Sequence, residues 1–191
     1  FKLGKLPEGT WVELEEAVLA TGSAPLKASY ETLLEEKAGG EPWKKFVGAL
    51  APGNAQKGRN IFYQNQTAQC IRCHAYDDMG GNAGPALDNI GTILSKEELL
   101  IALVDPSKRL APGYGSITVN LVGGSKITGI LLEEKKESYW IQVGTEKKEI
   151  AKKEVASSAM AASSMPPMGV LLSKREIRDL VSYLSTLKRT E

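Results

Sequence analysis

The spacing of apolar residues changes near Tyr114, and this change limits the folds that the chain can adopt. Upstream, apolar residues recur at helical spacing, whereas Ile117, Val119 and Leu121 alternate with polar residues. A Gly-Gly pair, which is a hairpin signal, follows them, and the alternation then returns twice more. The pattern predicts a three- or four-stranded antiparallel meander over about 114–151, set inside a helical chain.

Residues 1–53 have the pattern of short helices separated by turn-forming residues. Thr10 can act as the N-cap of the first helix, and Ala24-Pro25 can begin the second. These helices have too little apolar surface to form a core of their own. We therefore expect a helical lead-in that packs on the next domain, or the tail of an upstream helical-repeat domain.

Further helices are expected where polar residues can cap them, after Asn54, Ser95 and Ser173. The last two caps are each followed three residues later by a Glu, which completes a capping box. The stretch 156–169 is rich in Ser, Ala, Met and Pro, and it predicts a loop before the last helix.

Composition excludes several classes of partner. The chain has 24 Lys and Arg against 23 Asp and Glu, a net charge of +1, which gives no basic surface for nucleic acid. Its apolar runs are too short to span a bilayer. There is no signal peptide, and Phe1 is not an initiator Met, so we expect a mature form or an excised piece.

The chain's two Cys and single His are neighbours, in Cys70-Ile71-Arg72-Cys73-His74. Cys-x-x-Cys-His is the attachment signal for c-type haem. Two thiols at this spacing can form thioethers to the two vinyl groups on one edge of the porphyrin, and the adjacent His can bind the iron. The sequence therefore predicts one covalent haem c, held by Cys70, Cys73 and His74, with His74 as an iron ligand.

Three other uses of these residues compete with haem attachment. A thioredoxin-like dithiol would need a βαβ setting, which the pattern does not show. A structural zinc site would need four ligands, whereas the chain has only three Cys and His residues in all. A plain disulfide between Cys70 and Cys73 would leave His74 without a role.

The second axial ligand has to be a residue other than His, because His74 is the only one. Met is the next choice, and His/Met ligation raises the reduction potential. Met165 precedes a Pro-Pro pair that would stiffen its loop, so we expect Met165 to bind the iron. Met168 and Met160 are the alternatives, although core filling suits Met168 better; Met79 is too close to His74 in sequence.

Four segments carry a resemblance to a known family, and they occur in the family's order. They are Gly58-Arg59-Asn60-Ile61-Phe62, the Cys70–His74 motif, Gly84-Pro85-Ala86-Leu87, and Ser164-Met165-Pro166 before the last helix. From about Asn54 to its C-terminus the chain resembles the class I cytochrome c domain. It is most similar to the planctomycete-type haem-binding domain found at the end of large multidomain proteins.

The resemblance implies a fold. It implies a mainly α protein with the class I cytochrome c helical fold over 54–191, preceded by the short helices of 1–53. The stretch from His74 to Met165 is longer than in a small class I cytochrome, and the meander at about 114–151 accounts for the excess. The planctomycete-type domains also carry a β insertion between the attachment motif and the Met loop.

The resemblance also implies roles for residues around the haem. The carbonyl of Pro85 would accept a hydrogen bond from the second ring nitrogen of His74, and Leu87 would pack on the haem face. The first and last helices of the domain would cross closely, at Gly58, Phe62 and Tyr183.

The function implied is electron transfer by one covalent haem with His74 and Met165 as axial ligands, with no catalytic residues. The chain would be a module of a larger redox protein in the periplasm and not itself an enzyme. Its partner would be a redox protein or a fused dehydrogenase domain, with no nucleic acid and no membrane span. The alternatives are a ligand-binding or catalytic haem with a labile distal ligand, and an interaction domain whose haem is vestigial.

Overall fold

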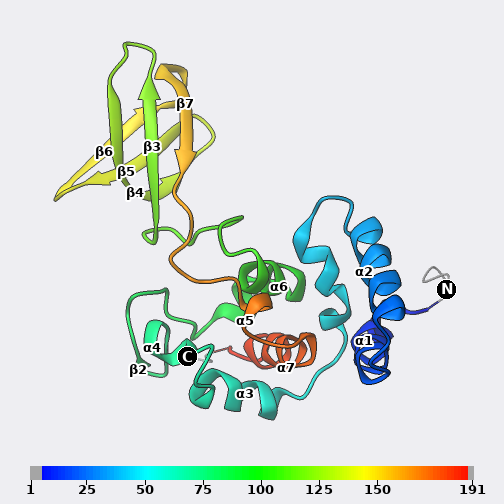
Figure 1. The fold of residues 1–191 in the computed structure, drawn as a ribbon. Helices are drawn as coiled ribbons and strands as arrows, with labels where there is room; N and C mark the ends of the chain where they lie inside the picture. Colours follow the sequence, from blue (N-terminus) through cyan, green and yellow to red (C-terminus); the bar gives the residue numbers. More distant parts are fainter. Residues whose placement is uncertain (1–5, 189–191) are drawn as a thin grey trace. The chain divides into compact units, whose positions relative to one another are not determined.

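The computed structural model describes residues 6–188, and the chain divides into two compact units (Figure 1). The first, called here the helical unit, comprises Phe1–Asp105 and Pro167–Glu191. The second, the β unit, comprises Pro106–Pro166. Each passage of the chain between the units therefore occurs at a proline, whose ring restricts the backbone there.

The helical unit begins with η2 (Glu8–Thr10), α1 (Trp11–Ala20), α2 (Ala24–Ala38) and η3 (Pro42–Leu50). The predicted pattern of short helices is confirmed, with the second beginning at Ala24, but the predicted cap at Thr10 is wrong. The Thr10 hydroxyl donates to the carbonyl of Pro7 at 2.8 Å and caps nothing. A small cluster of buried side chains joins the first two helices: Trp11, Val18, Tyr30 and Leu34.

The remainder of the unit contains α3 (Ala55–Gln64), α4 (Cys70–Cys73), β1 (Ala75–Tyr76), β2 (Met79–Gly80), α5 (Ile90–Ile93), α6 (Lys96–Val104), η5 (Met168–Val170) and α7 (Lys174–Leu184). The predicted caps are confirmed here. The side chain of Asn54 accepts from the Lys57 amide at 3.0 Å. Capping boxes form at Ser95 and Ser173.

Helices α3 and α7 lie side by side (Figure 1), and their crossing depends on Gly58. A Cβ at Gly58 would lie 2.0 Å from the carbonyl oxygen of Asp179, which no real contact allows. One turn along α3, the buried ring of Phe62 meets Tyr183 with 5.8 Å between ring centroids. The structure confirms the close crossing implied by the resemblance.

Replacing Gly58 by Ala will lower the free energy of unfolding by about 1–3 kcal/mol or more, because the added methyl overpacks the crossing. Helix propensity alone would favour Ala by about 1 kcal/mol. The sign of the change in the free energy of unfolding therefore shows whether overpacking or helix propensity dominates. Urea unfolding followed by circular dichroism measures the change. The matched control is Gly123→Ala, since a Cβ at Gly123 meets nothing within 4 Å. Equal unfolding midpoints for the two variants would contradict the prediction.

Charged side chains join α1 to the last helix. The Arg178 guanidinium, which is largely buried, donates to a Glu13 carboxylate oxygen at 2.8 Å. Arg175 pairs with Glu16, and Lys174 pairs with Glu15. These contacts, together with those of η3 with α6 and α7, place the N-terminal helices in one unit with α3 and α7.

The β unit is a five-stranded antiparallel sheet. Its elements are β3 (Gly115–Leu121), β4 (Lys126–Glu134), β5 (Ser138–Val143), β6 (Glu146–Ala151), η4 (Lys152–Glu154) and β7 (Val155–Met160), with strand order β6-β5-β4-β3-β7. Ile117 and Val119 of the predicted alternation are buried, and they form a cluster with Ile141 and Ile150. The β unit therefore has a hydrophobic core of its own.

The prediction of a mainly α, class I cytochrome fold is wrong. Of the described residues, 44% are helical and 21% lie in strands, and most of the strand residues belong to the five-stranded sheet. The alternation predicts an insertion of three or four strands, and the composition of 156–169 predicts a loop. Val155–Met160 instead form a fifth strand, β7, which pairs with β3 so that Ile117 lies opposite Met160. Ser and Ala have little strand propensity, so only this long-range pairing makes the segment a strand.

Candidate functional site

The two cysteines lie on α4, a single helical turn in the helical unit. The amide of His74 donates to the carbonyl of Cys70 at 2.9 Å, which closes the turn directly before the imidazole. Gln69, with φ of 47°, adopts the left-handed conformation that starts it. Both thiols are free, with Cys70 half-buried and Cys73 exposed. The local backbone thus presents two thiols and one imidazole in succession.

Burial raises the pKa of the Cys70 thiol to about 11, and the neighbouring Cys73 adds to the rise. The thiol is therefore protonated at neutral pH. Reactive dithiols of the thioredoxin type have a lowered pKa, because the thiolate is the nucleophile. The environment of Cys70 thus disfavours the dithiol alternative.

The imidazole of His74 is oriented by Pro85. Its Nδ1 lies 2.8 Å from the carbonyl oxygen of Pro85, and this is the contact that the resemblance implies. A carbonyl oxygen only accepts, so Nδ1 must carry the proton and donate it. In the neutral ring the lone pair is then on Nε2, the atom left to bind a metal.

Three glycines pack against this segment, and sequence reasoning gave none of them a role. A Cβ at Gly80 would lie 2.3 Å from the carbonyl oxygen of His74, and one at Gly81 would lie 1.9 Å from that of Arg72. A Cβ at Gly84 would lie 2.5 Å from Cε1 of the His74 ring. The signal was present in the sequence, as three glycines within residues 80–84, shortly after the motif.

The remaining predicted residues fall in different units. Leu87 is buried in the helical unit, where its amide donates to the carbonyl of Ala75 at 2.8 Å. Cys70, Cys73, His74, Pro85 and Leu87 therefore share one unit. Met165 belongs to the β unit, where it is half-buried and its amide donates to the Ser163 hydroxyl at 3.1 Å.

The other methionines have clear structural positions. Met168, in η5 of the helical unit, is only 2% exposed and packs as core. Met79 and Met160 are exposed, on β2 and β7 respectively. Met168 therefore fills the core, which is the role that the sequence analysis favoured for it over iron ligation.

These residues fit a c-type haem. Two free thiols one turn apart match a pair of vinyl groups, and the adjacent imidazole has its Nε2 uncommitted. Between residues 6 and 188, no three or more His, Cys, Asp or Glu side chains are grouped so as to hold a metal ion. A haem needs no such group, since the porphyrin itself supplies four ligands to the iron.

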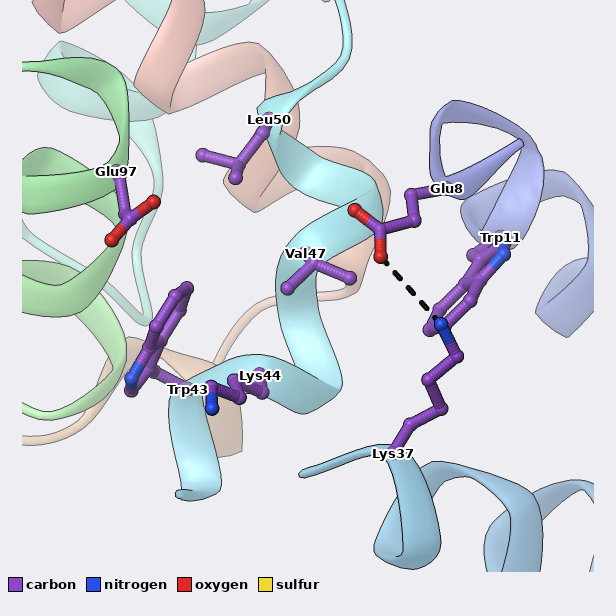
Figure 2. A pocket seen from close by; sticks show the side chains of 8 residues that line it. All are labelled: Glu8, Trp11, Lys37, Trp43, Lys44, Val47, Leu50 and Glu97. Carbon is purple, nitrogen blue, oxygen red and sulfur yellow. Dashed lines mark ion pairs between the residues drawn. The ribbon is translucent and has the colours of Figure 1, made fainter. Parts of the chain in front are cut away.

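A separate hollow lies in the helical unit between the N-terminal helices and α6 (Figure 2). Trp11, Trp43 and Val47 line it, and an ion pair between Lys37 and Glu8 at 3.7 Å lies beside Trp11. None of the predicted site residues takes part. Both indoles are buried as part of the packing between these helices, so we assign the hollow to packing.

Two further observations bear on the site's context. In the part of the chain that the structure describes, no helix has both the length and the apolar character needed to cross a bilayer. Comparison of the sequence with models of known protein families gives no match, and neither does comparison with curated proteins.

Proposed function

We propose that this chain binds one haem c covalently and works as an electron-transfer module, not as an enzyme in its own right. The observation that carries the proposal is the 2.8 Å contact between Nδ1 of His74 and the Pro85 carbonyl, directly after two free thiols on one helical turn. This contact leaves Nε2 of the one His in the chain available to iron. The similarity of four ordered segments to planctomycete-type haem-binding domains supports it.

The chain's own contribution to attachment would be the thiols of Cys70 and Cys73. Each S–H would add across a vinyl C=C, so that sulfur bonds to one carbon and the hydrogen goes to the other. The addition would involve no oxidant and no leaving group. It needs both cysteines reduced, and both are free in the structure.

The other residues position and tune the ligand. Pro85 holds the ring of His74 through Nδ1, which fixes the orientation of the ring. Leu87 would give apolar cover at the haem face, and Met165 would provide a thioether as the second ligand. A bound haem iron supplies a one-electron change between the ferrous and ferric states.

The chain has no further His for acid–base work at a haem, and this favours electron transfer over catalysis. The partner would be a redox protein or a dehydrogenase domain of a larger protein. We place the module in the periplasm, because the resemblance implies it and covalent attachment at this motif takes place outside the cytoplasm in bacteria.

A second candidate function is ligand binding or catalysis at a haem whose distal ligand is labile. One observation favours it: Met165 is only half-buried, whereas Met168 is packed in the core. A ligand side chain that is not enclosed by packing can leave the iron more readily.

Absorption spectra of the chain, produced together with haem-maturation proteins, test the proposal. We expect haem staining on a denaturing gel, a low-spin ferric spectrum with the weak long-wavelength band of sulfur ligation, and slow carbon monoxide binding after reduction. A covalent but high-spin haem that binds carbon monoxide at once would favour the second candidate. A chain without covalent haem would overturn both.

A further inference from the structure

We infer that Gly84 is a positioning residue for His74, because the absence of a side chain at residue 84 sets the orientation of the imidazole. The functional consequence of this inference rests on the proposed haem function. The packing of Gly84 on the His74 ring does not depend on that function. A Cβ at Gly84 would lie 2.5, 2.8 and 3.1 Å from Cε1, Nδ1 and Nε2 of the ring. The ring therefore packs directly on the backbone of this glycine.

Two consecutive residues, Gly84 and Pro85, contact the ring. Gly84 packs against the ring, and the carbonyl of Pro85 accepts from Nδ1 at 2.8 Å. The Gly84 amide in turn donates to the carbonyl of Cys73 at 2.8 Å, which ties this short segment to α4. The segment that orients the imidazole is thus fixed to the turn that carries the thiols.

A methyl group at residue 84 can be accommodated at low energetic cost by rotation of the His74 ring. The atoms that the methyl group would meet belong to the His74 side chain, which can rotate. The backbone at Gly84 is instead held by the hydrogen bond from its amide to the carbonyl of Cys73. Rotation moves Nδ1 away from the Pro85 carbonyl and turns Nε2. A Gly84→Ala chain should therefore keep α4 and its thiols but hold the imidazole in a different orientation.

The neighbouring Gly81 predicts a contrasting effect. Its Cβ would lie 1.9 Å from the carbonyl oxygen of Arg72, and its amide donates to the carbonyl of Ile71 at 2.9 Å. Both are backbone atoms of α4, so Gly81→Ala has to displace the turn itself. We expect Gly81→Ala to lower the amount of covalent haem, and Gly84→Ala to leave it unchanged.

The imidazole signals in a nuclear magnetic resonance spectrum can be assigned to His74 without ambiguity, because the chain has one His. The sample is the full chain, with any attached haem reduced to its diamagnetic ferrous state. In the native chain we expect a protonated Nδ1 and a strong cross-peak between Hε1 of His74 and the α protons of Gly84. Gly84→Ala should weaken the Nδ1–H signal, whereas Gly123→Ala, whose methyl meets nothing within 4 Å, should not.

Electron paramagnetic resonance of the ferric, haem-loaded chains adds a readout that a merely structural role would not move. The g-value spread depends on the plane of the axial imidazole, so Gly84→Ala should change it while haem staining stays at the native level. Native g values in Gly84→Ala, or a missing native cross-peak between His74 and Gly84, would overturn the inference. If the native chain takes up no haem, the proposed function fails, while the cross-peak still decides the geometry and needs no variant to fold.

Discussion

Replacing Cys70 and Cys73 together by Ala will remove all covalently bound haem from the chain. The thioethers are the only covalent links that the proposed site offers, so denaturation will strip any haem that still binds through His74. We expect haem staining to fall to background, whereas each single variant keeps one thioether and a reduced signal. The alkaline pyridine spectrum of the single variants should also shift, because one vinyl group stays unsaturated.

The structure suggests that these changes are mild for the fold. Cys73 is exposed and Cys70 only half-buried, and the turn they occupy is held by backbone hydrogen bonds such as that from His74 to Cys70. Far-ultraviolet circular dichroism of the double variant should therefore match the native spectrum. Met79→Ala is the matched control, since the Met79 side chain also carries sulfur and the residue is exposed nearby, on β2. Persistent staining in the double variant would refute attachment at these thiols.

Features that depend on a few neighbouring residues were predictable from the sequence. The boxes at Ser95 and Ser173 and the cap at Asn54 form as their residue types predict, because an N-cap needs only the next three residues. The cap predicted at Thr10 does not form, because residues 8–10 form a 3-10 helix in which the Thr10 hydroxyl donates to the carbonyl of Pro7.

Features that depend on distant partners were not predictable. Strand β7 has no alternation and, apart from Val155, no strand-forming residues, and it exists because β3 lies beside it. The fold class is wrong for a related reason. The resemblance of four motifs to one family predicts a helical fold in which the strands are a small insertion, whereas the sheet has five strands and a hydrophobic core of its own.

The candidate site was predictable where the motif itself specifies a contact. Cys70, Cys73 and His74 follow from the motif, and the His74–Pro85 contact follows from the resemblance. The packing of Gly84 on the imidazole required the structure, since a run of glycines does not say which atoms approach them. Met165 remains a prediction, carried by its place before the proline pair.

Replacing Met165 by Leu will convert the low-spin ferric spectrum to a high-spin one and lower the reduction potential. Leu keeps the volume of Met but has no sulfur, so packing is largely conserved while the proposed ligand is lost. A thioether prefers ferrous iron, and each tenfold preference contributes about 59 mV to a one-electron couple. We therefore expect the potential to fall by at least about 59 mV, measured by redox titration of the absorption spectrum.

Substitution of Met168 should have the opposite effect to substitution of Met165, because Met168 lies in the core of the helical unit and is 2% exposed. Met168→Ala should lower the free energy of unfolding by about 2–5 kcal/mol and leave the spectrum and potential unchanged. Met165→Leu should do the reverse, with little change in urea unfolding of the ligand-free state. A low-spin spectrum that is lost in Met168→Leu and kept in Met165→Leu would move the ligand assignment to Met168. If both variants keep the native spectrum, neither residue is the sixth ligand, and the labile-ligand function becomes the better description of the site.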